Sequence, residues 1–242
     1  MMRETNDADV TGKVRLSDEK AVEKILASAV MGLWELVNDL TRIQPSRRER
    51  YRVAIFGSAR AKPDTFAYDA VKRTAAALAE MGCDIVTGGG PGLMQAANEG
   101  AASNGLPERS LGIRVDLPFE QEVNPFVEQA FAHKTFFTRL HHFVIASDAF
   151  VVVPGGIGTV LETMMIWQLL QVRHVGGVPL ILVGGMWRGL VEWAAASMLD
   201  PRLPLAGAED MKIPICLDTA DEAIAAIREH HAKWTALGPR SA

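Results

Sequence analysis

The sequence predicts a doubly wound, mostly parallel α/β domain of the Rossmann-like class, with helices on both faces of the sheet. Short apolar runs alternate with stretches of helical spacing along most of the chain. These short runs are continuously apolar, which is typical of parallel strands that are buried on both faces. The chain has 242 residues, enough for one such domain with a substantial core.

Composition and pattern divide the chain into four regions. Residues 1–16 are polar, and we expect them to be disordered. Residues 17–45 carry apolar residues at helical spacing, with Ser17 as the expected cap. We expect this appended helix to pack on the main domain or on a second subunit. Residues 50–234 form the single Rossmann-like domain, and residues 235–242 form a C-terminal tail.

The elements of the main domain are expected in a strict order. Strands are predicted at residues 52–57, 83–90, 110–118, 149–156, 177–185 and 213–218. Helices are predicted at residues 63–82, 91–105, 135–147, 158–172, 186–199 and 219–234. Residues 119–134 are less regular. Because ligands bind at the carboxyl ends of strands in such sheets, the glycine clusters that follow three strands should meet at one edge.

Charge and composition argue against several classes of function. The formal net charge is −4 and no basic stripe dominates, so nucleic acid is not an expected partner. Cys83 and Cys216 lie in apolar strand-like segments and are expected to be buried, inert thiols without a disulfide or a metal site. No apolar run reaches the roughly 18 residues of a membrane span, and no apolar signal core is present. We expect a cytoplasmic protein.

The loop TGGGPGLM, residues 87–94, has glycines at four of five positions between a strand and a helix. Glycines allow close approach of a ligand and tolerate positive φ, and backbone N–H groups there would face the ligand. The helix start that follows adds a partial positive charge, which favours a phosphate. The alternative is a purely structural tight turn.

The loop PGGIGT, residues 154–159, repeats this arrangement after another strand. Thr159 could cap the helix or offer its hydroxyl to an anion. Two glycine-rich loops at one sheet edge together predict a phosphorylated ligand.

The two commonest nucleotide signatures are absent from the sequence. Neither glycine loop fits G-x-G-x-x-G, because Leu161 and Gln95 stand where the third glycine is required. No G-x-x-x-x-G-K-[ST] occurs either, which excludes P-loop hydrolysis of ATP or GTP.

The segments GGGPGLMQAANEGA and PGGIGTVLE resemble the hallmarks of the LONELY GUY (LOG) family, a GGGxxGxM-type loop and PGGxGTxxE. The resemblance covers about residues 50–230 and includes FGSAR and an arginine-bearing helix before the PGG strand. Members long carried the label lysine decarboxylase. The resemblance implies hydrolysis of a nucleoside 5′-monophosphate to a free base and ribose 5-phosphate. The base is a cytokinin in plants, and many bacterial members also use AMP.

The family's catalytic pair corresponds to Glu162 and Arg139 in this sequence. Cleavage of an N-glycosidic bond develops positive charge on the ribosyl carbon, which a carboxylate stabilises while it orients water. Arg139 would hold a ribose hydroxyl or Glu162 itself. The simpler interpretation of Glu162 is a helix acid favoured by the dipole.

The resemblance also implies a binding set. The 5′-phosphate would be held by the backbone of Gly155, Gly156, Gly158 and Thr159. Ser58 and the loop 88–92, including Gly89, Gly90 and Gly92, would line the nucleotide site, with Met94 near the base. No metal or redox cofactor is implied. The expected partner is a small-molecule nucleotide, and by resemblance the protein should be a homodimer.

The sequence departs from the family pattern at two places. Leu161 replaces the first of two acids that end the PGG motif, and Thr138 and Leu140 replace the usual neighbours of the arginine. A non-catalytic carrier of a nucleotide or of a molybdenum-cofactor type ligand therefore stays open as an alternative on the same fold.

Other candidates have simpler explanations. His141 and His142 are expected to pack or to lie at the surface. His133-Lys134 is similar to the end of a pyridoxal-phosphate motif, but Phe131 stands where the serine is needed. Met164, Met165 and Trp167 are expected in the core or at a dimer interface.

Overall fold

A computed structural model describes residues 14, 17–40, 49–105, 109–115 and 123–237. The chain divides into two compact units, residues 1–45 and 46–242, which are considered separately. Most of the N-terminal region expected to be disordered, and the last five residues of the expected tail, lie outside the described residues.

The first unit contains helix α1 (Glu19–Leu40). Its first turn is capped by Asp18, whose Oδ1 accepts the Ala21 N–H at 3.1 Å, so the prediction of Ser17 as the cap is wrong. The described apolar side chains Ile25, Leu26, Val30 and Met31 are all exposed.

The second unit is a parallel sheet of seven strands in the order β4-β3-β2-β1-β5-β6-β7. The strands are β1 (Arg52–Phe56), β2 (Asp84–Thr87), β3 (Ser110–Val115), β4 (Gln129–His133), β5 (Ala149–Val152), β6 (Leu180–Val183) and β7 (Pro214–Leu217). The strand order reverses between β1 and β5, as in other doubly wound folds.

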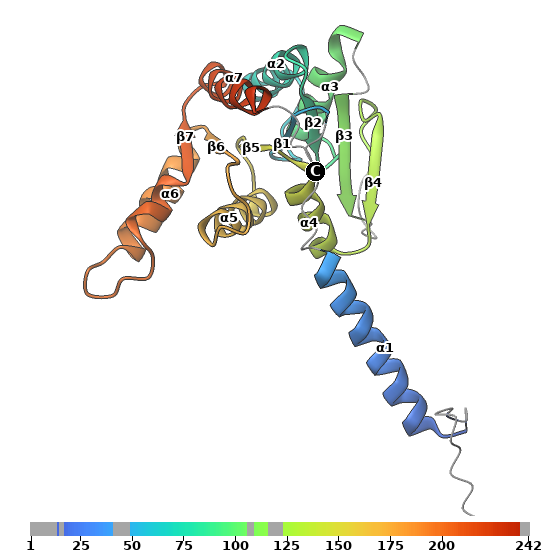
Figure 1. Cartoon of the computed structure of the whole chain (residues 1–242). Helices are drawn as coiled ribbons and strands as arrows, with labels where there is room; N and C mark the ends of the chain where they lie inside the picture. Colours follow the sequence, from blue (N-terminus) through green and yellow to red (C-terminus); the bar gives the residue numbers. More distant parts are fainter. Residues whose placement is uncertain (1–13, 15–16, 41–48, 106–108, 116–122, 238–242) are drawn as a thin grey trace, which may run out of the picture. The chain divides into compact units, whose positions relative to one another are not determined.

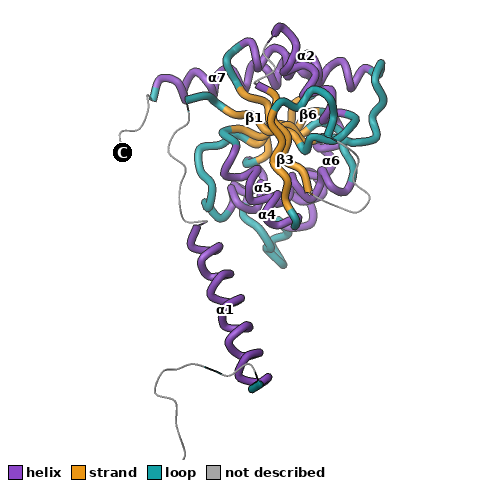
Figure 2. The backbone as a smooth tube through the Cα atoms, turned by 90° about the vertical axis from the view of Figure 1, so that its right-hand side faces the viewer, coloured by secondary structure: helices purple, strands orange, loops and turns teal. Residues whose placement is uncertain are grey.

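Helices cover both faces of this sheet, which Figure 2 shows with its strands between two helical layers. The helices are α2 (Phe66–Glu80), α3 (Leu93–Ala102), α4 (Phe136–Ala146), α5 (Ile157–Gln171), α6 (Gly185–Met198) and α7 (Ala220–Ala236). In Figure 1, α2, α3 and α7 lie on one side of the strands, while α4, α5 and α6 lie on the other. The predicted fold class is confirmed.

Alternation along the strands explains the two hydrophobic clusters. In β1, Val53 and Ile55 pack with α2, α3 and α7, whereas Ala54 and Phe56 pack in the cluster that contains residues of α4, α5 and α6. Successive side chains of a strand point to opposite faces, so a strand buried on both faces must be apolar throughout.

The strand β4 lies in a segment that the sequence left irregular. Its residues pair in parallel with β3, from Leu111↔Gln129 to Val115↔His133. Three of its five residues are exposed, because β4 is an edge strand of the described sheet. The continuous apolar pattern that identified the other strands is therefore missing here.

Both cysteines are free. Cys83 is buried as expected, and burial raises the pKa of its thiol to about 12. Cys216 is only half-buried, which differs from the expectation, although burial raises the pKa of its thiol as well. Among the described residues, no helix is both long and apolar enough to cross a membrane.

The close approach of α2 and α3 gives a matched stability test. A Cβ at Gly100 would overlap the Lys72 carbonyl oxygen, whereas a Cβ at Gly189, exposed in α6, would meet nothing within 4 Å. We expect Gly100→Ala to lower the free energy of unfolding by about 1–3 kcal/mol through overpacking. Gly189→Ala should raise it by up to about 1 kcal/mol through helix propensity. Urea unfolding measures both, and equal effects of the two substitutions would contradict the packing at Gly100.

Candidate active site

Three loops meet at the carboxyl edge of the sheet, as the glycine clusters predicted. Ser58, which follows β1, donates its backbone N–H to the Pro154 carbonyl at 3.0 Å. Its own carbonyl accepts the Leu93 N–H at 2.8 Å. Gly92 precedes α3 with a φ of +70°, and a Cβ there would overlap the Ser58 carbonyl oxygen. Only glycine therefore allows the loops after β1 and β2 to approach this closely.

The triple-glycine loop, residues 88–90, forms hydrogen bonds within the protein through some of its backbone groups. The N–H of Gly89 donates to Thr87 Oγ1 at 2.9 Å. The Gly89 and Gly90 carbonyls accept the Asn124 backbone N–H at 2.9 Å and its Nδ2 at 3.0 Å, respectively. The expectation that this loop presents free N–H groups is therefore wrong at Gly89, which is buried with a φ of +72°.

A buried asparagine pair that the sequence analysis missed supports this loop. Asn98 in α3 is fully buried and accepts the Thr87 hydroxyl at 2.6 Å and Asn124 Nδ2 at 3.0 Å. It also donates to Ser110 Oγ at 2.9 Å. The signal in the sequence was a polar residue directly after Ala96 and Ala97 on the apolar side of a helix.

The second glycine loop leads directly into α5. Its N-cap residue is Gly156, which makes no side-chain capping hydrogen bond. Gly156 and Gly158 are exposed, and a Cβ at either position would meet nothing within 4 Å. Thr159 is buried with its side chain against Gly155. Of the two roles predicted for Thr159, the cap is excluded, because the N-cap is Gly156 and no side chain makes a capping hydrogen bond. A helix start without a side-chain cap has backbone donors and positive potential for an anion.

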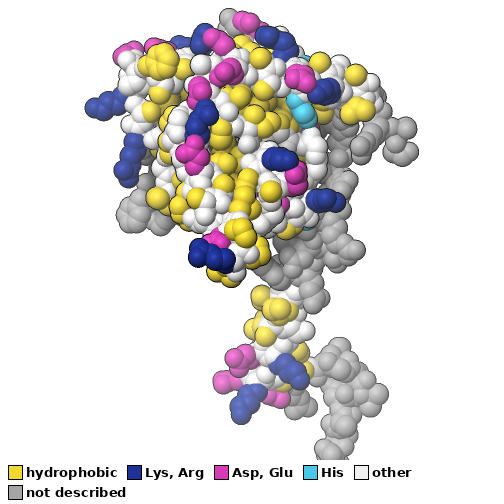
Figure 3. All heavy atoms as spheres, turned by 90° about the vertical axis from the view of Figure 1, so that its left-hand side faces the viewer, with side chains coloured by type: hydrophobic (Ala, Val, Ile, Leu, Met, Phe, Trp, Pro, Cys, Tyr) yellow, Lys and Arg dark blue, Asp and Glu magenta, His cyan; other side chains and the backbone are white. Residues whose placement is uncertain are grey.

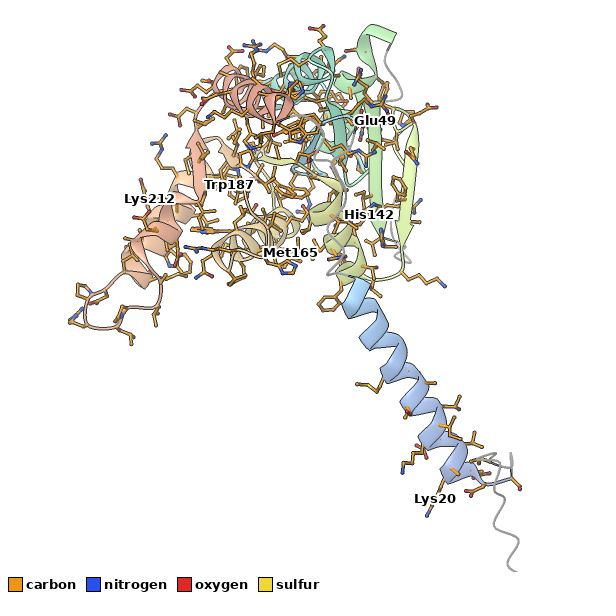
Figure 4. All side chains as sticks on the ribbon, viewed as in Figure 1. Lys20, Glu49, His142, Met165, Trp187 and Lys212 are labelled. Carbon is orange, nitrogen blue, oxygen red and sulfur yellow. The ribbon has the colours of Figure 1, made fainter. Side chains whose placement is uncertain are left out.

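The predicted catalytic pair forms an ion pair between two neighbouring helices. Arg139 Nη1 of α4 lies 2.9 Å from Glu162 Oε1 of α5, and their side chains are only 12% and 10% exposed. The Arg139 Nε donates to the Ile113 carbonyl at 3.0 Å. Its guanidinium also lies 5.1 Å from the centroid of the Phe143 ring. In Figure 4, His142 and Met165 mark the helices α4 and α5 that carry the pair.

The guanidinium also lies against the first glycine loop. A Cβ at Gly88 would come within 2.6 Å of Arg139 Nη2 and 2.7 Å of Met94 Sδ. A side chain at position 88 would therefore displace Arg139 or Met94. Gly88 belongs to the loop 88–92 that was predicted to line the nucleotide site, and it connects that loop to the Arg139–Glu162 pair.

The carboxylate of Glu162 is buried. Burial raises the pKa of its carboxyl group, and the charge and hydrogen bond of Arg139 oppose that shift. The neighbouring Leu161 is half exposed. A carboxylate that is desolvated and held by one guanidinium interacts strongly with any positive charge that develops beside it.

The remaining candidates occupy packing positions. His133 Nε2 and His142 Nδ1 lie 2.9 Å apart, and the His142 ring packs edge-on against Phe131. Burial lowers the pKa of His133, and the charge of Arg139 lowers it further. Trp167 is buried and donates its Nε1–H to the Asp210 carbonyl at 2.8 Å. Ser58 Oγ accepts the Arg60 N–H at 3.1 Å within a local turn.

In the part of the chain that the structure describes, no group of three or more His, Cys, Asp or Glu side chains could hold a metal ion.

A family model described as "Possible lysine decarboxylase" matches residues 94–227. The chain belongs to this family. The predicted membership of the LOG-like family is thus confirmed, although the match begins only at Met94, the end of the first glycine loop. A comparison with curated proteins found no match.

Solved structures with the same fold include proteins that carry cofactors. The molybdenum cofactor carrier protein of Chlamydomonas reinhardtii is 18% identical, with a TM-score of 0.58 over 76% of this chain and 99% of its own. The molybdenum cofactor binding protein of Rippkaea orientalis is also 18% identical, with a TM-score of 0.54 over 76% and 98%. A structural-genomics target, TM1055, is 21% identical, with a TM-score of 0.54 over 74% and 99%. At these identities, the likeness concerns the fold.

Glu162→Gln should change how stability depends on pH. Because burial raises the folded-state pKa of Glu162, the folded chain keeps this proton to higher pH than the unfolded chain. The native protein should therefore lose stability relative to the Gln variant as pH rises above the ordinary Glu pKa of about 4.3. The difference should level off above the raised pKa.

Urea unfolding of both proteins across this window measures the slope of the difference. The slope is the test, because the Gln substitution also leaves Arg139 without its charged partner at every pH. If the native protein instead gained stability relative to the variant as pH rises, the folded-state pKa of Glu162 would not be raised.

Proposed function

We propose that this protein hydrolyses the N-glycosidic bond of a nucleoside 5′-monophosphate, AMP or a cytokinin riboside monophosphate. The products are the free base and ribose 5-phosphate. The observation that carries the proposal is the buried Arg139–Glu162 pair, which lies against a glycine loop at the carboxyl edge of the sheet. Membership of the family supports a nucleotide-related function.

The chemistry follows from the position of the carboxylate. As the bond from C1′ to the base nitrogen breaks, the electron pair leaves with the base and positive charge develops on the ribosyl ring. Glu162 stabilises that charge and accepts a proton from the water that attacks C1′. The departing base takes up a proton in turn. Arg139 favours the ionised form of Glu162, opposing the effect of burial, and anchors a sugar hydroxyl.

The substrate phosphate would lie at the start of α5. Gly156 and Gly158 are exposed there, and the helix has no side-chain cap. Met94, which lies beside Gly88 and Gly90, would contact the base. The glycines 89 and 92 act on the substrate indirectly, by fixing the course of the loop.

A binding protein without catalysis is the second candidate. Leu161 leaves the motif with a single acid, and that acid is paired with Arg139. A carboxylate that stays paired would hold a ligand without activating water. The carrier proteins of the same fold give this alternative a precedent.

Incubation with AMP, followed by chromatographic detection of adenine, separates the two candidates. The enzyme should release adenine, and Glu162→Gln should lower kcat by about 10²–10⁴-fold. The variant should still bind ribose 5-phosphate in calorimetry, since the phosphate is held elsewhere. Tight binding of monophosphates without release of base from any of them would refute the hydrolase and favour the carrier.

Gly88→Ala tests the position of Arg139 without removing it. The added methyl group contacts the ends of two flexible side chains, so the guanidinium should move while the fold stays intact. We expect kcat/KM for AMP to fall at least about tenfold, because a displaced guanidinium no longer contacts the transition state. The melting temperature should change little. Gly189→Ala is the matched control, and equal activity of the two variants would contradict the role of Gly88.

We also propose that the protein is a homodimer whose interface lies beside this site. Phe137 at the start of α4 and Ile157 at the start of α5 are 81% and 87% exposed. Such exposed apolar groups next to a polar site are typical of an interface. A second apolar surface, which includes Met186 and Trp193, lies on α6, and Figure 3 shows hydrophobic side chains in a band across that side of the domain.

Light scattering of the full chain should give twice the chain mass of 26.3 kDa. Phe137→Asp should halve the measured mass, because it places a charge in the proposed interface. Trp193→Asp, at a side chain that is 55% exposed on α6, is the control and should leave the dimer intact. A monomeric native protein, or dissociation by the control alone, would refute this interface.

A further inference from the structure

A cavity lies at the carboxyl edge of the sheet, on the face opposite Arg139 and Glu162. It is a cavity of about 350 Å³ between α2 and α7, above the ends of β5 and β6. Its floor consists of Val151, Val153 and Val183. The volume lies within the range of small-molecule sites and exceeds ordinary packing defects.

The cavity exists because small residues face each other across it. Ala67 and Ala70 line it from α2, and Ala220 and Ala223 line it from α7. Gly184 at the end of β6 has a φ of +106°, which favours glycine over any residue with a side chain. Both helices and the strand end therefore leave the space between them unfilled.

The rim of this cavity is unsuited to a phosphate. The backbone N–H groups of Asp218 and Thr219 donate to Glu222 Oε2 at 3.0 and 2.9 Å, so the start of α7 is already capped. The charged side chains at the rim are paired as well, Arg73 with Asp221 at 3.1 Å and Asp218 with Arg188 at 2.8 Å. This contrasts with the start of α5, where no side chain caps the helix.

An aromatic side chain stands at the opening. Phe66, the first residue of α2, lines the cavity and is 90% exposed. A Phe side chain left in water forgoes the stabilisation that its burial would provide. A flat ring that enters the cavity would cover Phe66 and gain an offset-stacked or edge-to-face contact with it.

We propose that this cavity is a second binding site, for an uncharged molecule with a flat, largely apolar ring. The valine floor and alanine walls supply apolar contact, the paired rim disfavours anions, and Phe66 provides the stacking surface.

A ligand in this cavity would also touch the loop of the candidate active site. Pro154 lines the cavity, begins the PGGIG segment, and accepts the Ser58 N–H through its carbonyl. The binding site itself rests on the cavity alone and does not depend on the proposed hydrolysis.

Fluorescence titration of the full chain with N-phenyl-1-naphthylamine, an uncharged aromatic dye, tests the site. We expect saturable binding of one dye per chain. Ala70→Leu and Ala220→Leu fill the cavity from opposite walls, and each should weaken binding at least tenfold. Phe66→Ala should weaken it less. Excess AMP should not displace the dye, because the phosphate site lies on the other side of β5.

Two control variants locate the dye. Ala206→Leu fills a smaller cavity of about 180 Å³ next to α5 and α6 and should leave binding unchanged. Leu26→Asp alters the exposed apolar side of α1 and should also leave it unchanged. Circular dichroism confirms that each variant is folded. Absence of saturable binding, binding that both wall variants leave intact, or loss in a control alone would overturn the proposal.

Discussion

The ion pair between Arg139 and Glu162 is the interaction on which the candidate site depends. A carboxylate in apolar surroundings is costly unless a partner compensates its charge. That partner comes from the neighbouring helix and is itself fixed by the Ile113 carbonyl in β3 and the ring of Phe143. The two helices can meet there only because they cover the same face of the sheet. The topology thus brings together two residues that lie 23 positions apart in the sequence.

The loops around the pair are positioned by backbone geometry more than by charge. Ser58 connects the segments after β1, β2 and β5 through its own N–H and carbonyl groups. Asn98 and Asn124 hold the triple-glycine loop from within. Buried polar groups that are fully hydrogen-bonded restrict a loop to one conformation. The backbone at this edge of the sheet is therefore a preformed framework.

The sequence was sufficient for the fold, the pair and the meeting of the loops. Strands buried on both faces have a distinctive pattern. The resemblance to the LOG family singled out Arg139 and Glu162, which the structure brings together as an ion pair. The edge strand β4 was missed because its exposed residues lack that pattern. The hydrogen bonds of the Gly89 backbone could not be predicted. Its N–H donates to the Thr87 hydroxyl, and its carbonyl accepts the N–H of Asn124, which lies 35 positions away in the sequence. The cavity between α2 and α7 depends on how the two helices pack together. Alanines in two separate helical segments of the sequence do not show that they will face each other.

The contact between Gly88 and Arg139 has an evolutionary consequence. The absence of a side chain at position 88 matters because a long side chain from α4 occupies the same space. The two positions should therefore change together across the family. Where a shorter residue replaces the arginine, position 88 is released from this steric restriction, and a chain with a side chain at position 88 has lost this way of holding the guanidinium. Covariation at these two positions would distinguish members that keep the site from those that keep only the fold.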